Sequence, residues 1–154
     1  MYPLIRNRRL RASASIRRLV RETIITPDDF LVPLFAVEGK GIKDYYRMSL
    51  DHVEKEVKAL WNMGLCAVLL FVKVPDALKD NKGSEALNPD GLMQRAIKTV
   101  KNACPEMLVM TDVALDPFSS YGHDGIVADG QILNDETSEV LAEMSVSHAT
   151  AGAD

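Results

Sequence analysis

The sequence predicts an α/β fold of the TIM, or (β/α)8, barrel family, with the first three strand–helix units of a barrel and an N-terminal arm. Three apolar runs of strand length begin at Leu31, Ala67 and Met107, and their spacings of 36 and 40 residues are typical of parallel strand–helix units. A doubly wound sheet has the same element order, but no G-x-G-x-x-G motif follows the first run. Long segments after the second and third runs favour the barrel, whose active sites are built from such loops. We expect an arm over residues 1–26 and a partial barrel over residues 27–154.

The composition is that of an ordinary globular domain. The chain has 154 residues, of which 47% are hydrophobic and 26% are charged. Its longest apolar run, residues 67–72, is far shorter than the roughly 20 residues that cross a membrane, so we expect no membrane association. Cys66 and Cys104 lie far apart in apolar surroundings, which favours two buried free thiols over a disulfide or a metal site. Free thiols suit a reducing, cytoplasmic location.

The N-terminal arm is strongly basic. Seven of the 18 basic residues and none of the 22 acidic residues lie in residues 1–21, which leaves 11 basic against 22 acidic side chains in the remainder. Such an arm can bind nucleic acid, act as a transit peptide or dock on an acidic protein surface. Ile16, Leu19 and Val20 form one apolar stripe on a short helix, which favours docking on a partner subunit, with a targeting segment as the second choice. The arginines are Arg6, Arg8, Arg9, Arg11, Arg17, Arg18 and Arg21.

The first strand–helix unit follows a short turn that Thr26 caps. The apolar run 31–37 is continuous, which predicts a parallel strand buried on both faces, although Pro33 cannot donate to the ladder. Ser49 begins the first helix and Gly64 ends it. The predicted core face of this helix is Leu50, Val53, Val57, Leu60 and Trp61.

The second and third units repeat the pattern. Residues 67–72 predict the second strand, and Asn88-Pro89 predicts the start of the second helix. Residues 107–112 predict the third strand, a hairpin turn follows at Asp129-Gly130, and Asn134 begins the third helix. The predicted inward residues are Leu92, Met93, Ala96, Ile97 and Val100 on the second helix, and Thr137, Val140, Leu141, Met144 and His148 on the third, which Gly152 ends.

Three carboxylates stand in one short stretch, residues 111–125. Asp112 ends a predicted strand, and Asp116 and Asp124 follow on its loop. Carboxylates this close repel one another unless a cation or an ammonium group lies between them. The stretch therefore indicates either a divalent metal with oxygen ligands or a site for an amine substrate; the alternative is three solvated loop aspartates. His123, beside Asp124, is assigned a structural role in the loop.

The same stretch carries a resemblance to a known family. Residues 110–125 closely resemble the active-site loop of porphobilinogen synthases, also called 5-aminolevulinate dehydratases. The Arg-rich start resembles the arm of that family, so the resemblance covers nearly all of the chain. Further matches are Gly83-Ser84-Glu85-Ala86, Asn88-Pro89-Asp90-Gly91, Leu133-Asn134-Asp135-Glu136 and Ser147-His148-Ala149.

The resemblance implies an activity and an assembly. Family members are lyases that condense two molecules of 5-aminolevulinate into porphobilinogen with loss of two waters, a step in haem and other tetrapyrrole biosynthesis. They are TIM barrels whose arm embraces a neighbouring subunit, and the usual assembly is a homo-octamer. The loop between Gly39 and Tyr45 is expected to be shorter than in the family.

The resemblance also implies the site. Zinc-dependent members carry three cysteines where this chain has Ala114, Asp116 and Asp124, so we expect Mg²⁺ rather than zinc. Asp116 and Asp124 are the candidate metal ligands and hold the ammonium of the second substrate, directly or through the cation. Asp112 is the residue expected to orient or protonate substrate, and Phe71 is expected to line the pocket.

The catalytic lysines of the family stand on later strands, where each forms a Schiff base with substrate. Lys73 matches neither of them, and we interpret it as a solvated strand-end residue. Residues 1–154 alone are therefore expected to be inactive. Two rival functions are a non-catalytic assembly or regulatory module, which lysines after two downstream strands would exclude, and a nucleic-acid binder, which would bind in a strongly salt-dependent way.

Overall fold

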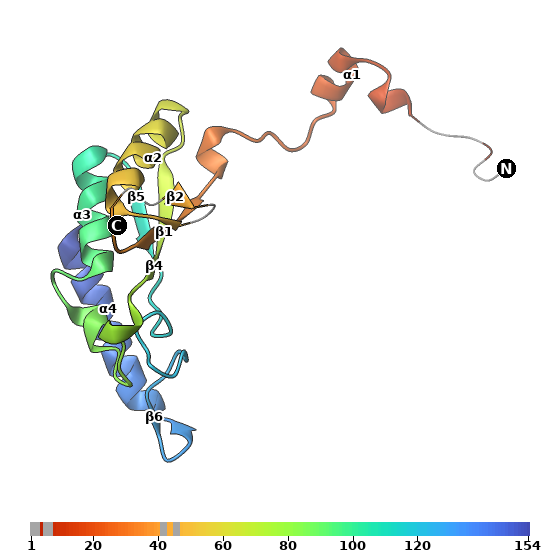
Figure 1. The fold of residues 1–154 in the computed structure, drawn as a ribbon. Helices are drawn as coiled ribbons and strands as arrows, with labels where there is room; N and C mark the ends of the chain where they lie inside the picture. The colour runs from red at the N-terminus through yellow and green to blue at the C-terminus, as the bar shows by residue number, and fades with distance from the viewer. Residues whose placement is uncertain (1–3, 5–7, 41–42, 45–46) are drawn as a thin grey trace.

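The computed structural model describes residue 4 and residues 8–40, 43–44 and 47–154. It contains a sheet with helices packed along one side, and an extended arm that projects away from this body (Figure 1). Arg6 of the arm and the expected shortening between Gly39 and Tyr45 fall wholly or partly outside the described residues.

The three predicted strands form the centre of the sheet. They are β1 (Val32–Val37), β4 (Ala67–Lys73) and β5 (Leu108–Thr111), and they lie side by side and parallel in chain order. In the register of the sheet, Phe35 pairs with Phe71, and Leu70 pairs with Thr111. Parallel order with helical crossovers confirms the predicted strand–helix units.

Two short strands extend the sheet beyond β1. These strands, β2 (Lys43–Asp44) and β3 (Arg47–Met48), complete the sheet order β2-β3-β1-β4-β5, with β3 parallel to β1 and antiparallel to β2. The sequence does not predict these strands, because two residues are too few to show an alternating pattern.

Three helices cover one face of the sheet. They are α2 (Leu50–Asn62), α3 (Leu92–Ala103) and α4 (Asn134–Ala151), and the residues predicted to face inward on α3 are all buried. On α2, Val53, Val57 and Leu60 are buried, but Trp61 is 40% exposed, so its assignment to the core is wrong. Gly152 ends α4 with a positive φ of 111°, as predicted.

The opposite face of the sheet is not covered by any of the described helices. Leu34 and Ala36 on β1 are buried against the helices, whereas the alternate residue Phe35 is 37% exposed. Leu108 and Met110 on β5 are likewise exposed. The expectation of burial on both faces is therefore wrong for these residues, because the described helices lie on one side only.

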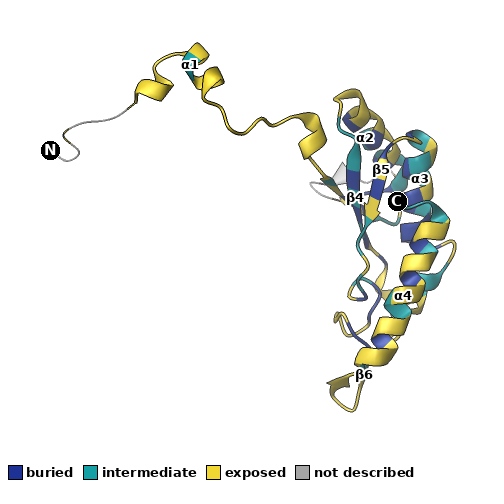
Figure 2. Ribbon diagram, turned by 180° about the vertical axis from the view of Figure 1, so that it is seen from behind, coloured by how far each residue is buried: buried dark blue, intermediate teal, exposed yellow. Residues whose placement is uncertain are grey.

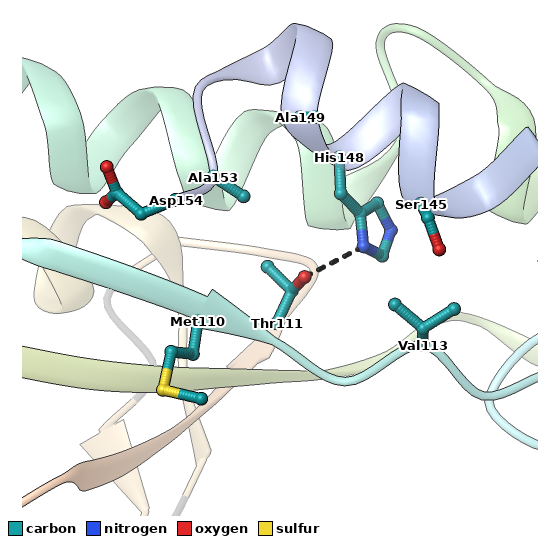
Figure 3. Close-up of a pocket in the computed structure, with 8 residues that line it drawn as sticks. All are labelled: Met110, Thr111, Val113, Ser145, His148, Ala149, Ala153 and Asp154. Carbon is teal, nitrogen blue, oxygen red and sulfur yellow. Dashed lines mark hydrogen bonds between the residues drawn. The ribbon is translucent and has the colours of Figure 1, made fainter. Parts of the chain in front are cut away.

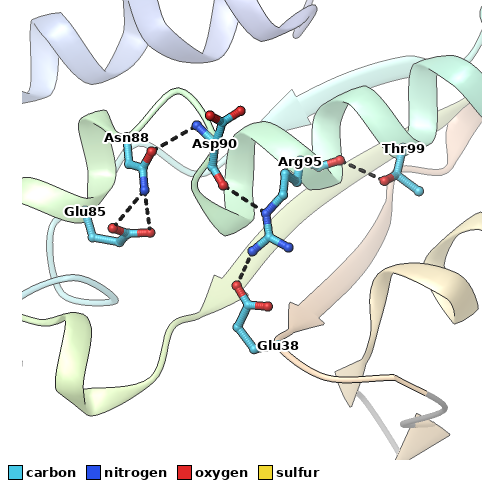
Figure 4. Close-up of polar contacts among 6 residues, drawn as sticks. All are labelled: Glu38, Glu85, Asn88, Asp90, Arg95 and Thr99. Atoms are coloured by element: carbon cyan, nitrogen blue, oxygen red, sulfur yellow. Dashed lines mark hydrogen bonds and ion pairs between the residues drawn. The ribbon is translucent and has the colours of Figure 1, made fainter.

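The start of α3 also differs from prediction. The helix begins at Leu92 rather than at Asn88-Pro89, because residues 88–91 form a turn. In this turn the Asn88 side chain accepts a hydrogen bond from the Asp90 N–H at 3.0 Å (Figure 4). The Gly91 N–H donates to the Asn88 carbonyl at 2.9 Å. Asparagine favours this local bond over helix geometry.

Short elements complete the described body. The turn at Thr26 is the one-turn helix η2 (Pro27–Asp29), as predicted, and two others, η3 (Asp76–Leu78) and η4 (Ser84–Leu87), follow β4. A hairpin joins β6 (Val127–Ala128) to β7 (Gln131–Ile132), with φ values of 51° at Asp129 and 75° at Gly130, which confirms the predicted turn.

The arm contains η1 (Arg9–Arg11) and α1 (Ala14–Leu19), and the Ser13 hydroxyl accepts a hydrogen bond from the Ile16 N–H at 3.1 Å. Its described residues are exposed except for the half-buried Ile16 (Figure 2). The predicted short helix is confirmed. In the described part of the chain, every helix is too short or too polar to span a bilayer.

Candidate active site

Phe35, Phe71 and Asp112 line up across the open face of the sheet near the carboxyl ends of the strands. The Phe35 and Phe71 rings stack with centroids 4.8 Å apart. The Asp112 N–H donates to the Leu70 carbonyl at 3.2 Å, which extends the β4–β5 ladder by one residue. Since side chains alternate along a strand, Asp112 lies on the same face as Phe71. The two stacked phenyl rings therefore lie next to the Asp112 carboxylate on this face.

The three predicted aspartates influence one another. Partial burial, followed by the negative charge of Asp124, raises the pKa of Asp112 above its usual value. The pKa of Asp116 is also raised, although its side chain is exposed: partial loss of surrounding water comes first, then the charge and the side-chain hydrogen bond of Asp124, with a smaller contribution from the charge of Asp112. Within the part of the chain that the structure describes, no basic group offsets these effects on either carboxyl. The loop thus holds an uncompensated negative cluster.

Asp116 and Asp124 are in direct contact in this cluster. The Asp116 backbone N–H lies 3.4 Å from Asp124 Oδ1, a long hydrogen bond that places the two residues side by side. Both residues are exposed on the loop, so water can reach them. Mg²⁺ takes oxygen ligands and is commonly held by one or two carboxylates with water completing its shell, so this pair fits the ion.

The donor set fits zinc poorly. Cys66 precedes β4 and Cys104 follows α3, so both thiols lie at the edge of the sheet opposite the aspartates. Among the described residues, no three His, Cys, Asp or Glu side chains are arranged to hold a metal ion by themselves. Structural and catalytic zinc sites use three or four such ligands. A bound cation here would depend on water or substrate for its remaining ligands.

The loop carrying Asp124 is fixed by the hairpin that follows it. The Ile126 N–H donates to Thr137 Oγ1 at 3.1 Å, and the Leu133 N–H donates to the Ile126 carbonyl at 2.8 Å. Gly125 is buried, and a side chain there would meet the Ile132 side chain at 2.4 Å. Close packing at Gly125 thus leaves room for glycine alone next to Asp124.

A hollow of about 400 Å³ lies beside the same loop. Asp76 and Lys79 line one side and form an ion pair at 3.0 Å, while Ser119 to Gly122 line the other. Lys73 ends β4 as an exposed residue, as predicted.

The carboxyl end of β1 is held by an ion pair that the sequence analysis did not predict. Glu38 follows β1 and pairs with Arg95 on α3 (Figure 4). Arg95 Nε also donates to the Asp90 carbonyl at 2.9 Å. Through these two contacts Arg95 links the segment after β1 to the turn at residues 88–91. Both lie at the same edge of the sheet as the aspartates.

His148 is a buried structural residue. Its Nδ1 lies 3.0 Å from Oγ1 of Thr111, the residue that precedes Asp112 in the sequence. The His148 ring also lines a cavity of about 280 Å³ between β5 and α4 (Figure 3). Burial lowers the pKa of His148, so the neutral ring is favoured. His123 is exposed on the loop.

The structure thus brings Asp112, Asp116 and Asp124 close enough to influence one another, and the strand register places Phe71 next to Asp112. Sequence reasoning missed Phe35, which stacks on Phe71. The signal was the apolar residue at the middle of the first strand, but a single strand gives no register, so its partner could not be identified.

Comparisons with known proteins identify relatives over nearly the whole chain. The profile of the delta-aminolevulinic acid dehydratase family matches residues 4–154. The chloroplastic delta-aminolevulinic acid dehydratase of Selaginella martensii is 47% identical over 157 residues, covering 97% of this chain and 38% of that protein. The enzymes of Chlamydia pneumoniae and Bacillus subtilis are 41% and 42% identical, each over 97% of this chain.

A solved structure agrees with these matches. The delta-aminolevulinic acid dehydratase (porphobilinogen synthase) of Toxoplasma gondii ME49, in complex with the reaction product porphobilinogen, superposes with a TM-score of 0.91 at 40% identity. The match covers 97% of this chain and 45% of that one. The chain spans about half of the length of these relatives or less.

Proposed function

The chain belongs to the delta-aminolevulinic acid dehydratase family, a family of TIM-barrel lyases, and from that membership we propose that the intact protein condenses two molecules of 5-aminolevulinate into porphobilinogen with loss of two waters. The observation that carries this proposal is the cluster of Asp112, Asp116 and Asp124 beside Phe71, at the carboxyl edge of a partial barrel. Active sites of this fold lie at that edge.

Each residue has a chemical task in the proposal. Asp112, whose pKa is raised by burial and by the charge of Asp124, is suited to hold a proton and give it to substrate at the sheet edge. Asp116 and Asp124 bind the amino group of the second 5-aminolevulinate, either directly as its ammonium or, once it has lost a proton, through the cation. Phe71, stacked on Phe35, covers the apolar part of the substrate. The Schiff-base lysines are expected outside residues 1–154.

The proposed cation is Mg²⁺, held by Asp116 and Asp124. When bound, it would supply positive charge that offsets the repulsion between these carboxylates and draws them together. The two carboxylates and the absence of cysteine from residues 105–154 support Mg²⁺ over zinc.

The arm and the location complete the proposal. The exposed basic arm, with apolar side chains at Leu10, Leu19 and Ile24, is proposed to dock on another subunit of a homo-oligomer, an octamer by family. The two free thiols, Cys66 and Cys104, support a reducing compartment, and we propose the cytoplasm.

The test is porphobilinogen formation by the intact protein after removal of metals. We expect activity with Mg²⁺ and none that depends on zinc. Asp124→Asn should lower kcat/KM about 100-fold or more, because it removes charge from the ammonium and cation site. Asp129→Asn is the matched control: Asp129 is exposed at the hairpin turn, and asparagine tolerates its positive φ.

One outcome would refute the proposed reaction, and another would refute only the proposed metal. A purified intact protein that forms no porphobilinogen with any metal would favour the non-catalytic assembly module. Activity that only zinc restores would show that the assignment of the metal is wrong while the reaction stands.

A further inference from the structure

Two consecutive residues in the segment after β4 contact both limbs of the loop that carries Asp116 and Asp124. These are Asp80 and Asn81, between η3 and η4. One limb of the loop is residues 118–120 and the other is residue 127, so Asp116 lies two residues before the first point of contact and Asp124 lies between the two.

Asp80 holds the first limb through its backbone. Its N–H donates to the Phe118 carbonyl at 3.2 Å, and its carbonyl accepts from the Ser120 N–H at 2.9 Å, which forms an isolated bridge with Ser119. The Asp80 side chain is used locally, because its Oδ1 accepts from the Ser84 N–H at 3.0 Å. Phe118 and Ser119 are buried at this contact, so the first limb is firmly anchored.

Asn81 holds the second limb through its side chain. Its Nδ2 donates to the Val127 carbonyl at 2.8 Å, and its Oδ1 accepts from the Val127 N–H at 3.0 Å. Both polar groups of one amide thus pair with both backbone groups of one residue, 46 positions away in the sequence. Only asparagine or glutamine offers a donor and an acceptor in this arrangement.

Val127 lies three residues after Asp124, and the intervening residues have little freedom. Gly125 is packed against Ile132. The Ile126 N–H donates a hydrogen bond to Thr137 Oγ1, and the Ile126 carbonyl accepts one from the Leu133 N–H. These contacts tie the second limb to its own hairpin and to α4. The bonds from Asn81 are the ones that connect it to the segment holding the first limb.

We propose that Asn81 is a positioning residue that sets the separation between Asp116 and Asp124, and with it the affinity of this pair for a divalent cation. The inference rests on the proposed Mg²⁺ site. Preorganised ligands bind more tightly than ligands that must be brought together on binding, so losing the Asn81 amide weakens cation binding without removing a ligand.

The experiment uses the intact protein and two readouts. Binding of Mn²⁺, which shares the oxygen-ligand preference of Mg²⁺, is measured by electron paramagnetic resonance without substrate. The Mg²⁺ dependence of porphobilinogen formation gives the half-saturation concentration and kcat separately. The variants are Asn81→Ala, which removes both bonds, and Asn81→Ser, whose short hydroxyl can keep one at most. Asn102→Ala is the matched control, because Asn102 is exposed near the end of α3, at the opposite edge of the sheet.

We expect the Mn²⁺ dissociation constant to rise about tenfold in Asn81→Ala, the scale of two lost hydrogen bonds of ordinary strength. The Mn²⁺ dissociation constant of Asn81→Ser should lie between those of Asn81→Ala and wild type. If Asn81→Ala does not fold, Asn81→Ser provides the test of the role of Asn81. The Mg²⁺ half-saturation concentration should rise in parallel, with kcat at saturating Mg²⁺ within about twofold of wild type. Asn102→Ala should match wild type.

Three results would overturn the inference. Unchanged Mn²⁺ affinity in folded Asn81 variants, while wild type remains Mg²⁺-dependent, would refute the role of Asn81 and leave the proposed function intact. A lower kcat at saturating Mg²⁺ with unchanged affinity would show that Asn81 acts only on the fold of the loop. A wild-type protein that neither binds Mn²⁺ nor responds to Mg²⁺ would instead refute the proposed metal site, and the inference with it.

Discussion

At the scale of single residues, the central feature is negative charge that the described chain does not neutralise. Asp112 and Asp116 both have raised pKa values, caused by burial and by the charge of Asp124. The sequence predicted this cluster because the three aspartates are close in the chain. It could not predict the bonds from Asn81 to Val127 or the stacking of Phe35 on Phe71, because these pairs are 46 and 36 residues apart in the sequence.

The first prediction follows from the sign of the Asp116 shift. Its pKa is higher in the folded than in the unfolded chain, so the folded state holds the proton more tightly, and stability falls as pH rises through the interval from about 3.8 to the raised value. Asp116→Asn should therefore stabilise the metal-free intact protein at pH 7. Since Asp116 is exposed, water screens its charge, and the gain should be about 1 kcal/mol or less.

Thermal unfolding at several pH values measures this effect. The gain in melting temperature should shrink as pH falls and vanish below 3.8, where the wild-type carboxyl is protonated in both states. Added Mg²⁺ should stabilise wild type more than the variant. A variant that is less stable than wild type at pH 7 without metal would show that the repulsion is not the dominant effect at this position.

At the scale of elements, the alternation of strands and helices was predictable, since each long apolar run became a strand of the central sheet. The predictions from sequence are wrong or incomplete where local or tertiary contacts determine which element forms. The turn at Asn88 delays α3 to Leu92, and the two-residue strands β2 and β3 exist only through pairing with β1. Trp61 continues the apolar stripe of α2 but is 40% exposed, whereas Leu60 beside it is buried.

The second prediction concerns the arm, an element whose residues find few contacts within this chain. Leu19 is 85% exposed, and Ile24 and Ile25 are each 68% exposed, which is costly for an isolated arm but suited to burial against a partner. Deleting residues 1–26 from the intact protein should reduce its mass in size-exclusion chromatography with light scattering.

The control for this deletion is the unfolding of the remaining body, which should be unaffected because none of the described arm residues belongs to the buried core. An unchanged oligomeric mass would contradict docking of the arm on another subunit. Loss of salt-dependent nucleic-acid binding on deletion would instead support the rival function of the arm.

At the scale of the whole molecule, the chain is a partial barrel with one covered and one open sheet face (Figures 1 and 2). The sequence predicted burial of both faces, because the apolar runs 31–37 and 67–72 are continuous. In the structure Phe35, Leu108 and Met110 remain exposed on the open face. The continuous apolar runs therefore reflect the burial of both sheet faces expected in a closed barrel, whereas the described part of residues 1–154 covers only one face of the sheet.

The third prediction follows from this open face. Residues 1–154, prepared alone, should self-associate, because exposed apolar side chains and the outer edge of β5 offer surfaces for other chains. Light scattering over a range of protein concentrations should show a mass that grows with concentration. Met110→Lys, which places a charge on the open face, should reduce the association. A monomer at all concentrations would contradict the description of this face as an incomplete interior.

The most direct test of the central claim, that this chain supplies the carboxylates but not the Schiff-base lysines of a porphobilinogen synthase, is imine trapping. The intact protein is incubated with 5-aminolevulinate and Mg²⁺, reduced with borohydride, digested and mapped by mass spectrometry. We predict reduced adducts on lysines outside residues 1–154, an unmodified Lys73, and full activity in Lys73→Arg. An adduct on Lys73, or porphobilinogen formed by residues 1–154 alone, would contradict the account.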